Sequence, residues 1–140
     1  MIVKDIMHPA TIIEPELTVA EAATLMKKKE IGSLMVKKGE KDWAIVTERD
    51  MLNKVVAENI QPADINVQDI MTDLRLTIDA NSPLEDASEI FNSGHVRRLP
   101  VMEKGEIVGI ITSRDVAKRW IFTRFRRRVE YSRGSGGNIR

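Results

Sequence analysis

The stretch AIVTERD at residues 44–50 returns as GIITSRD at residues 109–115, 65 positions later. A second motif also occurs twice, because VKDIM at residues 3–7 is matched by VQDIM at residues 67–71, an offset of 64. Further positions match in the same order at the offset of 65: Ala22 with Ala87, Leu34 with Leu99, Val36 with Val101, and Ile45 with Ile110. Ordered matches at one spacing predict that the chain consists of two copies of one structural unit.

Each copy is expected to contain the elements β-α-β-β-α in that order. Short β-rich segments predict strands at residues 11–14, 33–37 and 43–46 in the first copy and at residues 74–79, 99–102 and 107–111 in the second. After the first strand of each copy, apolar residues recur at helical spacing: Val19, Ala22, Ala23 and Met26, then Leu84, Ala87, Ile90 and Phe91. Capping boxes are predicted at residues 18–21 and 82–85, with Pro83 at the first position of the second helix.

Neither copy is expected to be stable without the other. A unit of about 60 residues with three strands buries little apolar surface by itself. With 42% hydrophobic and 31% charged residues, the 140-residue chain has the composition of an ordinary globular protein. We therefore predict an α/β (α+β) body in which two repeats, related by a pseudo-two-fold axis, pack face to face. The first repeat occupies residues 1–58, residues 58–66 connect it to the second repeat at 67–118, and residues 119–140 form a basic helical extension with a flexible end.

The residue content argues against catalysis. The chain has no Cys and only two His, and no nucleophile stands at a suggestive spacing from a base. Clusters of metal ligands are missing as well. His8 is expected to begin an exposed loop, and His95 lies either near a cleft mouth or in a plain turn. We expect a protein that is not an enzyme. The lack of cysteine favours the cytoplasm, and no segment is expected to act as a signal peptide or membrane span.

The repeated T-x-x-D motif has two interpretations. Thr47 and Asp50 in the first copy, like Thr112 and Asp115 in the second, fall where a strand ends and a helix begins. In one interpretation the threonine oxygen and the carboxylate satisfy free amides at the helix start. In the other, the aspartate accepts hydrogen bonds from ribose hydroxyls, while the threonine and the helix amides hold a phosphate. Judged on these four residues alone, capping is the favoured interpretation.

The wider context resembles the CBS-domain family. The resemblance is carried by G-h-h-T-x-x-D (h, apolar) with its A-h-h-T-x-x-D variant, by V-x-D-I-M, and by VRRLPV at residues 96–101, and it covers about residues 3–118. It implies a stand-alone tandem pair, or Bateman module, that senses an adenosine ligand without catalysing a reaction. AMP, ADP, ATP and S-adenosylmethionine are the ligands that the resemblance implies, and none of them is a required cofactor.

The resemblance also implies two clefts, each combining the motif of one repeat with strands of the other. The first cleft joins Thr47, Arg49 and Asp50 to Leu76, Thr77, Val96, Arg97, Arg98, Leu99 and Pro100. The second joins Thr112, Arg114 and Asp115 to Thr11, Ile12, Ile31, Gly32, Ser33, Leu34 and Met35. Because the first cleft has two arginines where the second has glycine and serine, a phosphate is expected to prefer the first. The same arginines would equally serve as protective charge on an exposed strand edge.

The end of the chain differs in charge from the rest. Residues 118–140 carry a net charge of +7 and the preceding residues −6. Apolar residues four apart extend the last helix, namely Ala117, Ile121, Phe125 and Val129. This stripe is expected to pack on the protein or to form a homodimer. The arginines of the opposite face leave open an alternative function, nucleic-acid binding with the repeats as platform or switch, and also contact with an acidic membrane surface. Under the sensing hypothesis an unidentified effector protein is a further expected partner.

Overall fold

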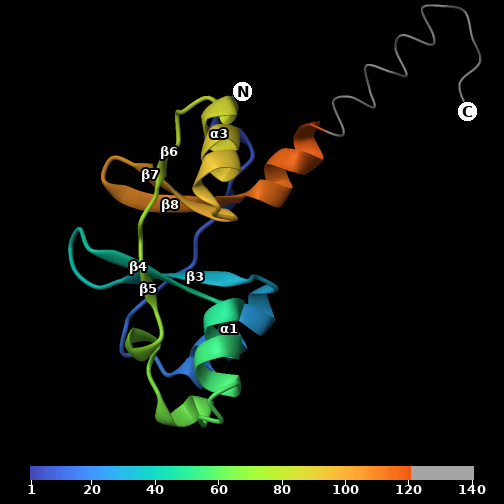
Figure 1. Ribbon diagram of the computed structural model, residues 1–140. Helices are drawn as coiled ribbons and strands as arrows, with labels where there is room; N and C mark the ends of the chain where they lie inside the picture. Colours follow the sequence, from blue (N-terminus) through green and yellow to red (C-terminus); the bar gives the residue numbers. More distant parts are fainter. Residues whose placement is uncertain (121–140) are drawn as a thin grey trace, which may run out of the picture.

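The computed structural model describes residues 1–120 (Figure 1). The first copy contains β1 (His8–Pro9), β2 (Ile12–Ile13), α1 (Val19–Lys29), β3 (Ser33–Lys37), β4 (Trp43–Thr47) and α2 (Glu48–Met51), which continues as the π-helical turn η2 (Leu52–Val56). The second contains β5 (Thr72–Asp73), β6 (Ile78–Asp79), α3 (Leu84–Gly94), β7 (Arg98–Glu103) and β8 (Glu106–Thr112). Short 3-10 turns lie at η1 (Val3–Asp5), η3 (Pro62–Asp64) and η4 (Val67–Asp69). The predicted mixed α/β architecture of two repeats is confirmed.

The two copies exchange their first strands. One sheet has the order β2-β3-β4-β5 and the other β1-β8-β7-β6, so β1 and β5 each join the sheet of the other copy. The strands β2 and β6 then run parallel to β3 and β7 of their own copies. The chain therefore crosses from sheet to sheet twice, and Figure 1 shows the β5–β6 crossing plainly. Each sheet has four strands where three were expected, because β1 and β5 are two residues long and carry no strand pattern.

The repeated V-x-D-I-M motif forms a 3-10 turn in each copy. The Ile2 amide donates to Asp5 Oδ2 at 2.9 Å, and the Asn66 amide donates to Asp69 Oδ2 at 3.0 Å. The valine that begins the motif is fully buried in both copies. The motif therefore anchors the start of each repeat, and it ends directly before the strand that crosses to the other sheet.

The helices of the two repeats begin differently. In α1 the predicted capping box is confirmed, because the Glu21 amide donates to Thr18 Oγ1 at 3.1 Å and Glu21 Oε1 accepts from the Thr18 amide at 3.4 Å. The second predicted box is wrong. The N-cap of α3 is Pro83, and no side chain caps this helix. Instead the Leu84 amide donates to the carbonyl of Met1 at 3.1 Å, so the backbone of the N-terminal segment replaces the expected serine cap.

Three apolar clusters form the interior of the described part of the chain, residues 1–120. One lies between α1 and its sheet, the second between α3 and its sheet, and the third between the two sheets. The third cluster contains Met35, Trp43, Ile107 and Ile110, all buried. Because it draws side chains from both sheets, the predicted face-to-face packing is confirmed. The boundary between the repeats is thus a hydrophobic core, which fixes the two halves relative to one another.

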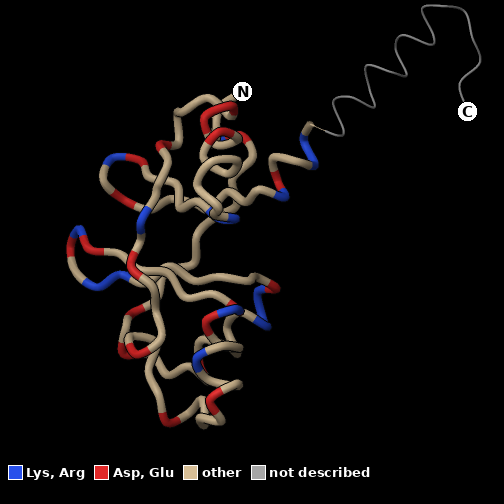
Figure 2. Tube along the Cα trace, viewed as in Figure 1, with Lys and Arg blue, Asp and Glu red and all other residues tan. Residues whose placement is uncertain are grey.

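The last described residues, 113–120, are helical. The Trp120 indole N–H donates to Ser88 Oγ of α3 at 3.4 Å, so this helix packs toward its own repeat. The apolar stripe and the arginines predicted beyond Trp120 lie outside the described residues. Figure 2 shows both signs of charge on both halves. Within residues 1–120, no helix is long and apolar enough to cross a bilayer.

Candidate ligand cleft between the repeats

Both T-x-x-D motifs cap the helices that follow them. The Thr47 amide donates to Asp50 Oδ2 at 2.9 Å, and the Asp50 amide donates back to Thr47 Oγ1 at 3.3 Å. In the second copy the Thr112 amide donates to Asp115 Oδ2 at 3.1 Å, and the Asp115 amide donates to Thr112 Oγ1 at 3.1 Å. The capping interpretation is confirmed, and it uses only one of the two oxygens of each carboxylate.

The second oxygen of Asp50 contacts a lysine and a threonine. Lys54 Nζ lies 3.1 Å from Asp50 Oδ1, and the Thr72 hydroxyl donates to the same oxygen at 3.4 Å. The same ammonium group donates to the carbonyl of Ile70 at 2.9 Å. Lys54 comes from η2 and Thr72 from β5, so the exchanged strand contributes one of the two side chains that contact Asp50 Oδ1. The side chain of Asp50 is only 13% exposed.

The second oxygen of Asp115 contacts a histidine instead. His8 Nε2, on the exchanged strand β1, lies 3.0 Å from Asp115 Oδ1. Burial raises the pKa of the Asp115 carboxyl, but the hydrogen bonds from His8 and Thr112 outweigh it, so the pKa is lowered from its ordinary value. The His8 side chain is 67% exposed. It therefore does not begin an exposed loop as expected, but lies in a strand and reaches the carboxylate of the other repeat.

Gly109 makes the approach of β1 to β8 possible. A Cβ placed on Gly109 would lie 2.5 Å from Met7 Sδ and 2.8 Å from the carbonyl oxygen of His8, both closer than real contacts allow. The first copy has Ala44 at the matching position, where the methyl group is fully buried in the cluster between α1 and its sheet. The two exchanged strands pair in the same register, Pro9 with Gly109 and Asp73 with Ala44, so the tight approach at Gly109 is specific to the second repeat's sheet.

A cavity of about 800 Å³ lies between the repeats, at the ends of the two motifs. Four arginines line it together with both motif threonines and one acid: Arg49, Arg97, Arg98, Arg114, Thr47, Thr112 and Glu48. Ile45, His95, Val96 and Ser113 complete the wall. His95 is the C-cap of α3 with a φ of 53°, so it both ends the helix and lines the cleft.

The cavity brings together residues that the sequence assigned to two separate clefts. Thr47, Arg49, Val96, Arg97 and Arg98 come from the first set, and Thr112 and Arg114 from the second. The carboxylates of Asp50 and Asp115 do not line it. Of the remaining predicted residues, Ser33, Leu34, Met35, Leu99 and Pro100 are buried within the sheets, and Thr11, Ile12, Leu76 and Thr77 lie on or beside the crossing segments.

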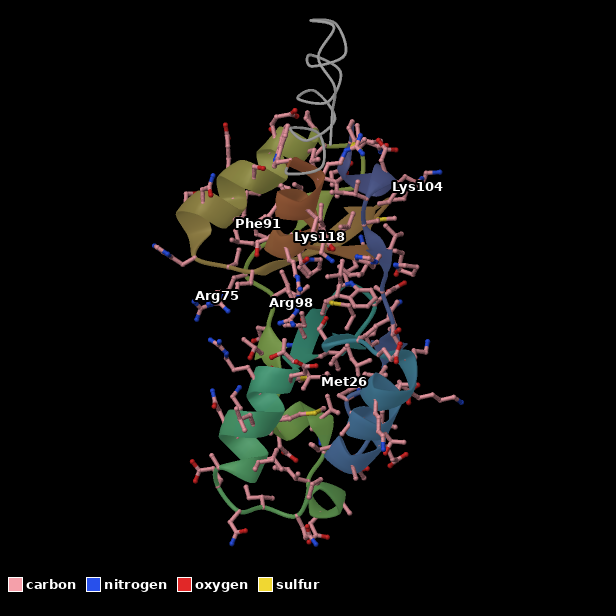
Figure 3. All side chains as sticks on the ribbon, turned by 90° about the vertical axis from the view of Figure 1, so that its right-hand side faces the viewer. Met26, Arg75, Phe91, Arg98, Lys104 and Lys118 are labelled. Carbon is pink, nitrogen blue, oxygen red and sulfur yellow. The ribbon has the colours of Figure 1, made fainter. Side chains whose placement is uncertain are left out.

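Arg98 reaches across the boundary to the first repeat. A Cβ placed on Gly32 would lie 2.8 Å from Arg98 Nη2 and 3.3 Å from Glu48 Cδ. Gly32 therefore leaves the space that the guanidinium fills, and the Glu48 carboxylate lies beside the same space. Figure 3 shows Arg98 at the level where the two halves meet. Arg98 is half-buried, whereas Arg97 is exposed, so the interpretation as exposed surface charge is excluded for Arg98 only.

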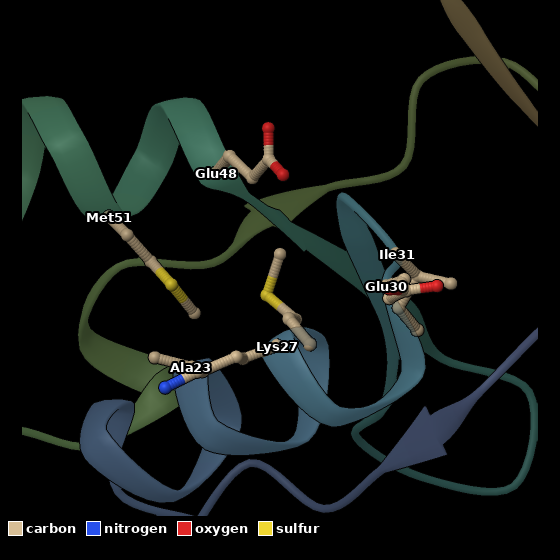
Figure 4. Close-up of a pocket in the computed structure, with 7 residues that line it drawn as sticks. Ala23, Lys27, Glu30, Ile31, Glu48 and Met51 are labelled. Atoms are coloured by element: carbon tan, nitrogen blue, oxygen red, sulfur yellow. The ribbon is translucent and has the colours of Figure 1, made fainter.

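A second cavity, of about 460 Å³, lies between α1 and α2 (Figure 4). Its walls combine four apolar residues with three charged ones: Ala23, Met26, Ile31 and Met51, and Lys27, Glu30 and Glu48. Ile31 is the one residue of the predicted clefts that lines it. Among residues 1–120, no three His, Cys, Asp or Glu side chains gather where a metal ion could bind.

Sequence reasoning missed the residues that hold the outer oxygens of the two aspartates. His8 and Thr72 are 64 positions apart, the same offset as the V-x-D-I-M motif, and each directly follows that motif. Extending the alignment of the two repeats by one residue, past the V-x-D-I-M motif, would have identified His8 and Thr72 as equivalent positions. Lys54 carried no comparable signal, because its counterpart in the second copy, Arg119, is a different side chain.

The geometry defines a class of protein, a tandem repeat with exchanged strands and a basic cleft between its halves. The family model of the CBS domain matches residues 3–57 and 67–121, so the chain belongs to the CBS-domain family. The CBS domain-containing protein YhcV of Bacillus subtilis is 30% identical over 116 residues, which are 82% of this chain and 82% of YhcV. The chain spans only 62% and 53% of two relatives from Methanocaldococcus jannaschii and Methanopyrus kandleri.

Solved structures with this fold include proteins with a stated ligand or assembly. A CBS domain protein from Pyrobaculum aerophilum, complexed with AMP, has a TM-score of 0.70 and 26% identity, over 82% of this chain and 89% of that one. A hexameric CBS-CP12 protein from bloom-forming cyanobacteria has a TM-score of 0.79 and 28% identity, over 96% of this chain and 83% of that one.

Proposed function

We propose that this chain is a non-catalytic regulatory module that binds an adenine nucleotide between its two CBS repeats. The observation that carries the proposal is the cavity at the boundary, lined by the threonine and the arginine of the T-x-x-D motif of each repeat. The AMP complex of the Pyrobaculum relative supports the adenosine part of the proposal. Because both repeats contribute to this cleft, a bound ligand would contact both and would affect how they pack against each other.

The two aspartates are assigned to the ribose. Each uses Oδ2 for its helix cap and presents Oδ1 to a neighbouring side chain, and ribose hydroxyls are the groups that would replace that neighbour. The exposed His8 is easier to displace from Asp115 than Lys54 is from Asp50, because Lys54 also donates to a backbone carbonyl. We therefore expect unequal occupancy of the two carboxylates. Ribose at Asp115 meets the weaker competitor, so this argument favours the second cleft, whereas the arginine pair in the sequence favoured the first.

The remaining roles follow from position. Thr47 and Thr112 stand at helix starts and are assigned, with the arginines, to phosphate. The adenine is assigned to the strand ends and crossing segments of the opposite repeat: Leu76, Thr77, Val96, Leu99 and Pro100 on one side, and Thr11, Ile12, Ile31, Gly32, Ser33, Leu34 and Met35 on the other. Their buried apolar neighbours offer a flat base a dry surface.

Ligand binding would act on a boundary that is already a shared core. A nucleotide that contacts both halves binds only the paired native state and therefore stabilises it. At about 100 times its dissociation constant, such a ligand adds roughly 2.7 kcal/mol to the free energy of unfolding. An effector protein that contacts both halves would sense the same change. The homodimer and the cytoplasmic location stay predictions; the hexamer of the CBS-CP12 relative supports self-association, which sedimentation analysis of the full chain would test.

The test is calorimetric titration of the full chain with AMP and with GMP, combined with thermal unfolding. Asp50→Asn and Asp115→Asn are better probes than alanine, because asparagine keeps a side-chain oxygen that can accept from the threonine amide at the helix start. We expect AMP to bind and to raise the melting temperature by several degrees, and GMP to bind more weakly. Each asparagine variant should weaken AMP binding while the free variant remains folded at the temperature of the titration. AMP that neither binds nor stabilises the wild-type chain would refute the proposal.

A further inference from the structure

The cavity between α1 and α2 is formed by the first repeat alone. All of its lining residues belong to that repeat, and Glu48 is the one residue that it shares with the cleft between the repeats. Its volume of about 460 Å³ is within the range of small-molecule sites. Met26, which is 5% exposed, and Met51 bring two thioethers to its wall, and Figure 4 shows the Met51 side chain directed from α2 toward α1. Methionine side chains adapt readily to the shape of a neighbouring group.

The second repeat has an aromatic side chain over its own helix at the matching place. The Trp120 indole N–H donates to Ser88 Oγ at 3.4 Å, and Ser88 matches Ala23 at the offset of 65. At the same offset Trp120 matches Val55, which is buried in the core of the first repeat. No aromatic residue lines the cavity beside Ala23. An aromatic ring bound there would therefore lie over α1 as the indole of Trp120 lies over α3.

Two carboxylates in the wall of the cavity are free of ion pairs. None of the ion pairs found within residues 1–120 involves Glu30 or Glu48. Together with Lys27 they give the wall a net formal charge of −1. Glu30 also ends α1, where the last carbonyl groups of the helix favour a positive charge. The second repeat has His95 and Ser113 at the two matching positions, so the acidic wall is specific to the first repeat.

We propose that this cavity is a second small-molecule site, and that it binds an aromatic amine. The ring lies against Met26 and Met51, because contacts between sulfur and an aromatic ring are favourable. The ammonium group lies beside Glu48 and Glu30. The four arginines of the cleft between the repeats repel a cation, so the same ligand is disfavoured there. The inference does not depend on the proposed nucleotide site, and its test is made without nucleotide.

The experiment is an NMR titration of the full chain, with isotope-labelled methionine methyl groups. The probes are tryptamine, indolepropionate and methylammonium, which separate the contribution of the ring from that of the charge. The methyl signals of Met26 and Met51 report on the cavity, and conservative Met→Leu variants assign them. Met7 lines neither cavity and is the internal control.

Three variants locate the site. Ala23→Leu places a larger side chain in the cavity, and leucine suits a helix nearly as well as alanine. Glu48→Gln removes one negative charge from the wall. Glu16→Gln is its matched control, because Glu16 is exposed, lines neither cavity and loses the same charge. Circular dichroism checks the folding of each variant, and the exposed Glu48 keeps the test valid if Ala23→Leu does not fold.

We expect tryptamine to shift the signals of Met26 and Met51 and methylammonium to leave them unchanged. Tryptamine should bind about fivefold or more tightly than indolepropionate, and Glu48→Gln should weaken tryptamine by up to about fivefold, the range of an exposed ion pair. Glu16→Gln should bind tryptamine like the wild type, and Ala23→Leu should not bind it.

Several results would overturn the amine site. Indolepropionate that binds as tightly as tryptamine would do so, as would equal losses in Glu16→Gln and Glu48→Gln. Shifts at Met7 without shifts at Met26 and Met51 would place the ligand elsewhere. Signals of Met26 and Met51 that move when the free protein is diluted would show that a second copy of the chain covers the cavity. None of these results bears on AMP binding, so the two proposals can fail separately.

Discussion

Substituting Gly109 by alanine should separate β1 from β8, although the change adds only one methyl group. That methyl would meet Met7 Sδ at 2.5 Å and the His8 carbonyl oxygen at 2.8 Å. The thioether can turn away, but the carbonyl belongs to the strand itself, whose register pairs Pro9 with Gly109. The backbone of β1 must therefore move, and His8 must move with it.

The expected cost is that of overpacking a well-filled site, about 1–3 kcal/mol. A loss of about 2 kcal/mol lowers the melting temperature of a domain of this size by roughly 5–10 °C. Urea denaturation followed by circular dichroism measures the loss in free energy of unfolding directly. The double variant Met7→Ala with Gly109→Ala should recover only part of it, because the carbonyl remains in the way.

The first repeat provides the comparison for this prediction. Ala44 occupies the matching position with its methyl group packed in the core, so the repeat fold itself accepts a side chain there. A Gly109→Ala protein as stable as the wild type would refute the reasoning, and full recovery in the double variant would show that Met7 is the only obstacle. In either case the inferred dependence of the His8–Asp115 contact on Gly109 would be wrong.

Three further predictions concern stability. Because the pKa of the Asp115 carboxyl is lowered in the folded state, its contribution to the free energy of unfolding is present above the unfolded pKa of about 3.9 and is lost as the pH falls through the folded pKa. The difference in free energy of unfolding between wild type and Asp115→Asn, measured by urea denaturation, should thus shrink as the solution is acidified, and a difference that stays constant or grows in acid would contradict this. Thr18→Ala should lower the free energy of unfolding, measured by urea denaturation, by about 1 kcal/mol, whereas Ser82→Ala should leave it almost unchanged, because Thr18 caps a helix and Ser82 does not. Equal losses in the two variants would contradict this assignment of the caps. Glu30→Gly should stabilise by about 0.5–1 kcal/mol, because Glu30 ends α1 with a left-handed φ of 55°, and a destabilised variant would contradict that reasoning.

The repeat was the strongest signal in the sequence, and it predicted the architecture because each matched pair occupies the same place in its copy. The α1 helix begins where its capping box places it. The exchange of β1 and β5 could not be predicted, since a strand of two residues owes its position to the partner sheet and not to its own pattern. The predicted cap of α3 was wrong for a similar reason. The first amide of this helix, that of Leu84, donates to the carbonyl of Met1, a contact that exists only in the folded chain.

The candidate site was predictable in part. The motif threonines and arginines do meet at the boundary between the repeats, as the resemblance implied. The lining of the cavity combines arginines that the resemblance assigned to two separate clefts, and one of them, Arg98, reaches over Gly32 of the other repeat. The position of the Arg98 side chain depends on the absence of a Cβ at Gly32 in the other repeat. A sequence pattern does not show that these two residues meet, so this contact could not be predicted.

The most direct test of the nucleotide-sensing account is a crystal structure of the full chain grown with ATP. We predict electron density for the nucleotide with its phosphates in the cavity between the repeats, against Arg97 and Arg98, and with its ribose outside the cavity wall, its hydroxyls on Oδ1 of Asp115 or Asp50 in place of His8 or Lys54. Density for ATP at any other place, with His8 still on Asp115 and Lys54 still on Asp50, would contradict it.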